Sequence, residues 1–425
     1  MTAFAIFEVL QQLSSRPALF SVSLAQSNNT TAIIDAFSSL GLTSFALAAS
    51  ALNGSSAGQA LLETVLSGGN YSILAPNNDA CRSYKYSTNS QFNINSTSDS
   101  TLLTDTLAYH ILRGSFTNSD SSSFNLTSAS SPNHTIGRSM LNDSAYVSLE
   151  GNASQVVAWT TESNKLVFLN QPSNISIVNS TRINGTGLDV YVIDGVLSIP
   201  ASISSVLANG TNTSSIAGLL NSTMIPSANG TNDTIGNILN SQKGITLFAP
   251  SDSAFSTVSS SLPTLEGNLT VFTTVLQNHI INGSSVYSTE IVSGSNLTSA
   301  AGEPLTFLTN SSGTYVTSGS TTAKILTTDM IAMNGVVHVI DNVFLNTDSD
   351  SSAASSAYES ATSVATKLAT ETGAISATAT AASSTSSSSS GSGSSNGAEA
   401  TSVGFSLYTT FSAVVVSFVI LGGLL

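Results

Sequence analysis

Four histidines and one cysteine are the side chains of this sequence best suited to act as base, nucleophile or metal ligand. They are too few and too scattered for a zinc site. The sequence also lacks the Gly-x-Ser-x-Gly elbow, the His-Glu-x-x-His helix, the phosphate-binding loop and the calcium loop. A Ser-His-Asp triad needs no adjacent residues and stays open, although abundant serine makes a chance triple ordinary. We therefore predict no catalytic residue, metal site or cofactor, and keep a wall-modifying enzyme as the catalytic alternative.

Two of the histidines occupy matching places in an internal repeat. His110 and His279 each lie on the apolar face of a run with helical spacing, and Tyr109 precedes the first of them. A single histidine on such a face is usually a hydrogen-bonded core residue, and the alternative is contact with a partner. Tyr109, His110 and His279 are thus our candidate partner-binding residues. Asp194 and Asp341 also recur, beside an expected turn, where capping of the backbone is favoured over general-base chemistry.

The repeat itself is carried by two longer segments. Tyr71–Cys81 (YSILAPNNDAC) reappears as Ile245–Phe255 (ITLFAPSDSAF), and Leu188–Leu197 reappears as Val336–Leu345. The offsets between copies fit a domain with its own core rather than a short solenoid repeat. Because Cys81 aligns with Phe255, we expect it to be a small core residue rather than a reactive thiol.

Within each copy, helical spacing dominates the first half and short β-rich runs the second. Asn77 and Ser251 follow the Ala-Pro pairs and are good helix N-caps. Asn334-Gly335, between two β-rich runs, predicts a hairpin. The fold class is therefore α+β, with one domain over residues 28–200 and a second over 205–346.

These segments resemble the two signature boxes of the fasciclin domain family. Gly244–Phe255 and Asn334–Leu345 are similar to the first and second box, while the first domain is more divergent, with Cys81 in place of an aromatic residue. The resemblance implies a β-sandwich or wedge with helices packed around it, in secreted or surface-anchored adhesion and matrix proteins. Fungal and plant members often carry a GPI anchor. A Tyr-His pair is linked to adhesion in animal members, and Tyr109-His110 matches it, whereas the second copy keeps only His279.

Composition places the chain outside the cytosol. Only 8% of residues are charged, and the net charge of −14 disfavours nucleic acid and anionic lipid as partners. Asn-x-Ser/Thr sequons occur on the order of twenty times, which is typical of a secreted glycoprotein, although an Asn/Ser/Thr-rich chain also produces some by chance. The candidate glycosylation sites are Asn29, Asn53, Asn125, Asn184, Asn221, Asn268 and Asn310.

Both ends carry targeting signals. Residues 1–25 form an atypical signal peptide with expected cleavage after Ala25. Residues 347–400 are rich in Ser, Thr and Ala without apolar periodicity, which predicts a disordered, O-glycosylated stalk. Small residues and a spacer then lead to an apolar tail within 401–425, the order of a GPI attachment signal, with Asn396 as the attachment residue. A transmembrane helix is the alternative for this tail.

Together these features predict a GPI-anchored surface glycoprotein whose two domains act in adhesion without catalysis. The expected partners are components of the cell surface, wall or matrix, including a second copy of the chain, with the GPI lipid as membrane anchor and no nucleic acid. We expect the protein on the outer leaflet of the plasma membrane or in the cell wall. The alternative within the binding class is a vacuolar or endomembrane protein that uses the same domains in trafficking.

Overall fold

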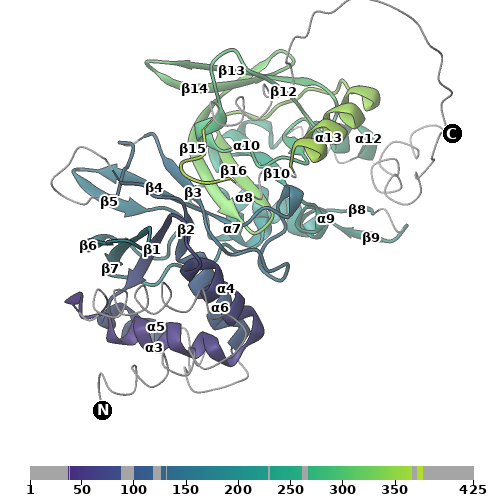
Figure 1. Ribbon diagram of the computed structural model, residues 1–425. Coiled ribbons are helices and arrows are strands. Elements are labelled where there is room, and N and C mark those ends of the chain that lie inside the picture. Colours follow the sequence, from purple (N-terminus) through teal and green to yellow (C-terminus); the bar gives the residue numbers. More distant parts are fainter. Residues whose placement is uncertain are drawn as a thin grey trace, which may run out of the picture.

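The computed structural model describes residues 37, 39–87, 100–117, 126–130, 132–227, 230–260, 267–365 and 371–376. Two α+β domains lie side by side in it, each with helices packed on a sheet (Figure 1). The expected signal peptide and the apolar tail lie outside the described residues. Among the helices that the structure describes, none is long and apolar enough to cross a membrane.

The first domain has a four-stranded sheet in the order β2-β1-β7-β6 and a separate three-stranded sheet in the order β3-β4-β5. Its elements are α3 (Thr43–Ala51), η1 (Leu52–Gly54), α4 (Ser56–Leu66), β1 (Tyr71–Pro76), α5 (Asn78–Ser87), α6 (Ser100–Tyr109), β2 (Ile111–Arg113), β3 (Thr135–Arg138), η3 (Glu150–Asn152), β4 (Val156–Glu162), β5 (Lys165–Phe168), β6 (Ile177–Ile183) and β7 (Leu188–Ile193).

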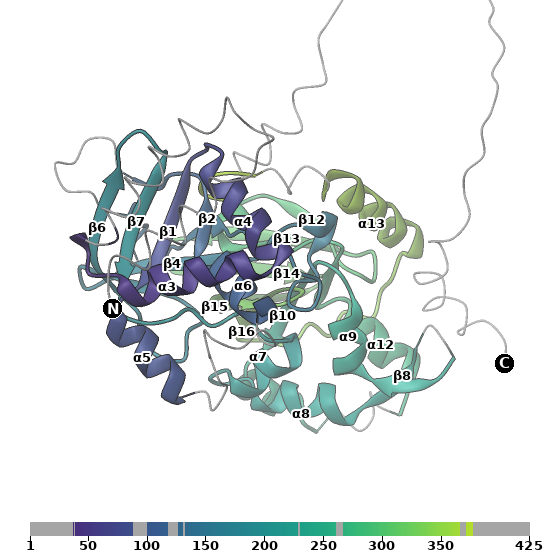
Figure 2. The same cartoon turned by 60° about the horizontal axis from the view of Figure 1, so that its bottom comes forward.

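The second domain has one seven-stranded sheet in the order β11-β10-β16-β15-β14-β13-β12 and a small β8-β9 pair. Its elements are α7 (Ile203–Asn209), α8 (Ser214–Ser222), β8 (Met224–Pro226), β9 (Asn232–Thr234), α9 (Ile235–Ser241), β10 (Ile245–Pro250), α10 (Asp252–Val258), α12 (Leu269–Gln277), β11 (Ile280–Asn282), η4 (Ser288–Glu290), β12 (Asn296–Thr298), β13 (Pro304–Asn310), β14 (Gly313–Ser318), β15 (Thr321–Ala332) and β16 (Gly335–Ile340). Figure 2 shows α7, α8 and α9 grouped beneath this sheet.

The two repeated sequence segments contain two neighbouring strands of the main sheet of each domain. β1 pairs in parallel with β7, and β10 pairs in parallel with β16 in the same register. All six residues of β7, β10 and β16 are buried, as are five of the six in β1, which explains why their sequences are mostly apolar. The internal repeat is therefore the repeat of a buried parallel strand pair.

The predicted caps and hairpin are confirmed. The side chain of Asn77 accepts from the Ala80 N–H at 2.7 Å, and Ser251 accepts from the Ala254 N–H at 3.2 Å. β15 and β16 form an antiparallel hairpin that closes on the pair Ala332–Gly335. Gly335 thus lies in the strand rather than in the turn, and a Cβ there would meet the Ile245 carbonyl oxygen at 1.9 Å.

The structure differs from the stalk expectation over residues 351–365. This stretch forms helix α13 (Ser351–Ala365), which lies beside the second domain (Figure 1). Alanine is the strongest helix former, and the Asp350 carboxylate caps the helix by accepting from the N–H groups of Ser352 and Ala353. Low apolar content misled the prediction because α13 rests on the domains and needs no core of its own.

Candidate functional site

His110 links two segments of the first domain through hydrogen bonds of both ring nitrogens. Its side chain is fully buried, and the Leu197 N–H donates to Nε2 at 2.9 Å. Nδ1 therefore carries the proton and donates to the Thr106 carbonyl at 2.7 Å. Burial lowers the pKa of His110 to about 4, so the ring stays neutral. Tyr109 beside it is also buried and donates to the Val156 carbonyl at 3.2 Å.

His279 repeats this arrangement in the second domain. Its Nδ1 donates to the Val275 carbonyl at 2.7 Å, and its Nε2 accepts from the Phe344 N–H at 3.0 Å. Burial again lowers the pKa to about 4. Each histidine thus ties a helix end to the segment after the last strand. In this geometry Tyr109, His110 and His279 are not placed to contact a partner, because both copies are enclosed by their own domain and both ring nitrogens are used.

In the second copy, Asn278 stands at the position that Tyr109 occupies in the first, and the structure shows why. Asn278 is fully buried, and its Nδ2 donates to the carbonyls of Asn346 and Asp348 at 3.0 and 3.1 Å. Its Oδ1 accepts from the Ser299 hydroxyl at 2.8 Å. The asparagine therefore holds the chain where it leaves the second domain.

The recurring aspartates cap the backbone as predicted, whereas Cys81 is half-buried rather than a core residue. The Asp194 carboxylate accepts from the Ser176 N–H at 2.6 Å, and Asp341 accepts from the Lys324 N–H at 2.7 Å. Both cap the neighbouring strand. Burial raises the pKa of the Cys81 thiol to about 11, which keeps it protonated and unreactive at neutral pH.

The largest concentration of buried polar groups lies between the two domains, where sequence reasoning placed nothing. Its centre is an apolar cluster from both domains, comprising Ile136, Val156, Ala158, Tyr287, Ile331, Val336 and Ile375. Beside it, the Gln155 side chain donates to the Ala332 carbonyl at 3.0 Å, and the Ser148 N–H donates to the Met333 carbonyl at 2.8 Å. Direct bonds between domains over a shared core indicate a fixed joint.

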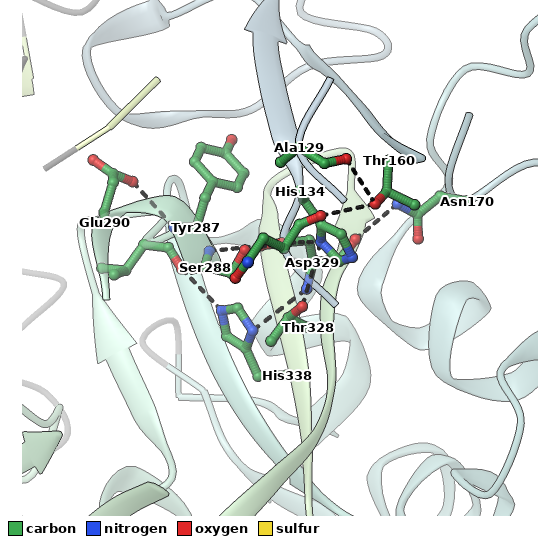
Figure 3. A network of polar contacts seen from close by, with 12 residues as sticks. Ala129, His134, Thr160, Asn170, Tyr287, Ser288, Glu290, Thr328, Asp329 and His338 are labelled. Carbon is green, nitrogen blue, oxygen red and sulfur yellow. Dashed lines mark hydrogen bonds and ion pairs between the residues drawn. The ribbon is translucent and has the colours of Figure 1, made fainter. Parts of the chain in front are cut away.

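Asp329, in β15, is the hub of one polar group at this joint (Figure 3). His134 of the first domain lies 2.6 Å from its carboxylate through Nδ1, and Asn170 donates to its carbonyl at 2.7 Å. From its own domain, Ser288 donates through the backbone N–H at 2.7 Å and also through the hydroxyl. His338 accepts from the Asp329 N–H at 3.4 Å. In this group, residues of both domains therefore bind the same buried aspartate.

The electrostatics of this group favour an ionised carboxylate. Burial by itself raises the pKa of Asp329, but the hydrogen bonds from His134 and Ser288, with the nearby His338, hold it below its usual value. Burial lowers the pKa of His338, whose Nε2 donates to the Val286 carbonyl at 2.9 Å. Asp329 also has a positive φ of 57°, a backbone conformation that aspartate and asparagine tolerate better than most residues.

This geometry is unlike a nucleophilic triad. In a triad the histidine lies between serine and aspartate and takes the proton from the hydroxyl. Here the carboxylate lies between Ser288 and His134, and it accepts from both of them. The Ser288 hydroxyl is held as a donor, so the arrangement stabilises a joint and does not activate a nucleophile.

A second polar group flanks the other side of the apolar cluster. Glu150 of the first domain accepts from the Ser285 N–H at 2.9 Å and from the Ser285 hydroxyl at 2.8 Å. Arg138 is buried and pairs with Glu371 at 3.0 Å. Burial raises the pKa of Glu290 to about 7, with the charges of Glu150 and Glu371 adding to the effect. Within the described residues, no group of three His, Cys, Asp or Glu side chains is arranged to hold a metal ion.

Comparison with known proteins agrees with the two-domain architecture. The model of the fasciclin domain matches residues 44–200 and again 220–346. The chain belongs to the fasciclin domain family. A curated relative, a fasciclin-like arabinogalactan protein of Arthroderma benhamiae, is 26% identical over 284 residues, which is 67% of this chain. The match spans 60% of the relative's own length.

A solved structure with detectable similarity is a FAS1 domain pair from the insect cell adhesion molecule fasciclin I. It is 17% identical, covers 68% of this chain and 93% of that chain, and has a TM-score of 0.32.

Sequence reasoning missed the joint between the fasciclin domains because its polar residues come from distant segments. His134 and Asp329 are 195 residues apart, and Glu150 and Ser285 are 135 apart. In the structure, β15 shifts register between Thr327 and Met330, which leaves a bulge at Asp329.

Four of the predicted glycosylation sites lie on the surface of the fasciclin domains. These are Asn184, Asn221, Asn268 and Asn310. Asn268 is exposed and caps α12 through Oδ1, which accepts from the Val271 N–H. Asn29, Asn125 and Asn396, and the side chain of Asn53, lie outside the described part of the chain.

Proposed function

We propose that this chain is a cell-surface glycoprotein in which a rigid pair of fasciclin domains acts in adhesion, without catalysis. The observation that carries the proposal is the joint itself. Its most enzyme-like group, Ser288 with Asp329 and His134, is arranged to hold two domains together. A fixed pair presents both domains in one orientation, which suits weak contacts made in parallel by many copies on a surface.

Exposed Asn-x-Ser/Thr sequons on both domains support an extracellular site of action. The relative named as an arabinogalactan protein supports a heavily glycosylated product. We propose cell-wall or matrix components, or a second copy of the chain, as partners. We further propose anchoring through a GPI lipid at Asn396, with residues 401–425 as the removed signal.

The anchor is tested by release of the protein from intact cells with a phosphatidylinositol-specific phospholipase. Val415→Arg places a charge in the apolar tail and should divert the protein from the surface, whereas Ser388→Arg in the Ser-rich segment should leave it there. Retention of the native protein after phospholipase treatment, or no difference between the two variants, would contradict a GPI anchor.

Adhesion is tested separately by deleting the gene and measuring cell–cell and cell–substrate attachment, wall integrity and surface hydrophobicity. We expect weaker attachment that the wild-type chain restores. A tag placed between the signal peptide and the first domain reports whether the protein reaches the surface or the vacuole. Unchanged attachment in the deletion strain, with the tagged protein in the vacuole, would reject the adhesion proposal.

A further inference from the structure

The chain that leaves the second fasciclin domain returns to the first one. We call residues 347–365 and 371–376 the strap; residues 366–370 lie outside the described part. The strap begins where Asn278 binds the carbonyl of Asp348, and the Asp350 N–H donates to the Ala301 carbonyl at 2.8 Å. Helix α13 then runs beside the second domain, and the last six residues pack on the first. A segment with the composition of a stalk is thus part of the folded unit.

Glycines of both domains lie where the strap comes closest. A Cβ at Gly302 would meet the Asp350 carbonyl oxygen at 1.8 Å, and one at Gly283 would meet the Tyr358 ring at 2.9 Å. In the first domain, a Cβ at Gly151 would meet the Ala365 carbonyl oxygen at 2.1 Å, and one at Gly114 would meet the Gly373 nitrogen at 2.7 Å. Larger residues at these positions would displace the strap, so both domain surfaces are shaped to receive it.

The terminal part of the strap, Glu371–Ser376, is bound against β2 and β3. The Gly373 N–H donates to the Arg113 carbonyl at 3.0 Å, and the Ile375 N–H donates to the Ile136 carbonyl at 2.9 Å. Gly137 and Ala374 form an antiparallel bridge. The strap therefore adds backbone pairing to two strands of different sheets in the first domain.

Two side chains make this binding specific. Ile375 is 2% exposed and completes the apolar cluster between the domains, in contact with residues of both. Four positions earlier, Glu371 pairs with the buried Arg138, accepting from Nε at 3.0 Å. Thr372 and Ala374, which alternate with these positions, are exposed. The site therefore selects an extended segment with a carboxylate followed four residues later by a branched aliphatic side chain.

We infer that the site that binds Glu371–Ser376 is a detachable latch. Tension applied to the chain beyond residue 376 opens this latch before the force acts on either domain. The contacts that hold this terminal segment include the backbone hydrogen bonds from Gly373 and Ile375, the ion pair of Glu371 and the buried side chain of Ile375. By contrast, β16 is paired along its whole length with β10 and also with β15. Only the expectation that the chain is under tension rests on the proposed function, because a membrane anchor at Asn396 would transmit force to the domains through the strap.

Release of the latch has two consequences. It uncovers the apolar cluster at the domain joint and leaves Arg138 without its carboxylate partner. It also lengthens the tether, because the 11 residues between the end of α13 at Ala365 and Ser376, at about 3.5 Å each, give at most about 40 Å of extended chain. The domain pair then loosens and moves away from its anchor while both domains remain folded.

The test is single-molecule pulling of the purified full chain between an N-terminal handle and a Ser388→Cys handle. We expect a first extension of at most about 40 Å at lower force than domain unfolding. Ile375→Asp should abolish this step and keep the domain unfolding steps, whereas the matched control Ala374→Asp, at an exposed neighbour, should retain it. A native chain without the step, or an Ile375→Asp chain that keeps it, would overturn the inference.

Hydrogen exchange on the same proteins provides a second readout. The amides of Gly373 and Ile375 should be protected in the native chain and in Ala374→Asp, and should exchange freely in Ile375→Asp. Unchanged protection of β10 and β16 would show that the variant is folded. Free exchange of residues 371–376 in the native chain would reject the latch. Neither measurement depends on where the protein resides in the cell, so failure of the proposed function would leave both results standing.

Discussion

Replacing Asp329 by asparagine isolates the contribution of the joint between the domains. The carboxylate accepts from the Ser288 N–H, the Ser288 hydroxyl and His134, and it is 1% exposed. Asparagine keeps the shape of the side chain and tolerates the positive φ, so the backbone adds no new strain. One acceptor oxygen, however, becomes an NH2 group that faces a donor.

The expected magnitude follows from these contacts. A hydrogen bond to a charged group contributes about 1.5–3 kcal/mol, and a buried donor left without a partner costs about 1–3 kcal/mol. We therefore expect Asp329→Asn to lower the free energy of unfolding by about 3 kcal/mol, a large share of the roughly 5–15 kcal/mol typical of a domain. The loss should shrink below about pH 4, because the stabilisation by a carboxyl with a lowered pKa disappears as it is protonated.

The assay is urea unfolding at pH 7 of Asp329→Asn, His134→Ala and the double variant. A direct bond between domains predicts a coupling free energy of about 1.5–3 kcal/mol. Asp341→Asn is the matched control, because Asp341 is exposed and asparagine can still accept from the Lys324 N–H; it should change stability by less than about 0.5 kcal/mol. If the losses at His134 and Asp329 simply add, the two domains are not coupled through this carboxylate.

Three further outcomes can be measured by the same unfolding assay. Below about pH 6, His279 stays neutral in the folded protein but becomes protonated in the unfolded chain. The free energy of unfolding of the native chain, relative to that of His279→Gln, should therefore fall by about 1.4 kcal/mol per pH unit between pH 6 and 4.5. A difference that does not change with pH would argue against a buried neutral ring. Glu290 has a raised pKa of about 7, so its ionisation opposes folding, and Glu290→Gln should stabilise the protein at pH 8 but not at pH 5. Gly335→Ala should destabilise the second domain by more than about 3 kcal/mol because its Cβ would strike the Ile245 carbonyl, whereas Gly218→Ala, with open space around it, should be neutral or slightly stabilising; equal effects would show that the strand pair can yield.

The sequence predicted those features that depend on neighbouring residues. The strands of the repeat, the caps at Asn77 and Ser251 and the hairpin before β16 are each specified within a few residues, so their patterns survive in a single chain. Alignment of the two copies also indicated that Cys81 is not a reactive thiol, although the residue is half-buried rather than part of the core. The histidines illustrate the limit of this approach. Helical spacing put His110 on an apolar face, but only the structure shows that the Leu197 N–H fills its second nitrogen.

The joint and the strap could not be predicted because their information is not local. Arg138 and Glu371 are 233 residues apart, and nothing near either residue signals the other. The composition of residues 347–376 indicates a chain unable to form a core, which is correct for the segment alone. It becomes ordered because two finished domains supply the surface, the glycines and the buried arginine. A segment that binds to the domains of its own chain can therefore have the same composition as an unstructured linker.

Comparison of the two copies explains why the joint forms between these two surfaces. β7 and β16 match residue for residue, with Tyr191 at the place of His338. The strands that pair with them differ. In the first copy, one residue of β6, Ser180, separates the residues that pair with Val192 and Val190. In the second copy, two residues of β15, Thr328 and Asp329, separate the residues that pair with Val339 and Val337. The second copy thus carries one extra residue at the point where it receives the first domain.

That extra residue makes the two sides of the joint different, because only the second domain carries it. The bulge turns Asp329 toward His134 and Asn170, and His338 receives the displaced N–H. The first domain has neither the bulge nor the histidine at the matching edge, so it offers no equivalent carboxylate to a preceding copy. A head-to-tail array built on the same contact is therefore not expected, and the interface closes on a pair. Inserting one aspartate after Ser180 and replacing Tyr191 by histidine would test whether the receiving surface can be transferred: a native chain that stays monomeric while this variant self-associates would support the argument, and a variant that folds yet remains monomeric would refute it.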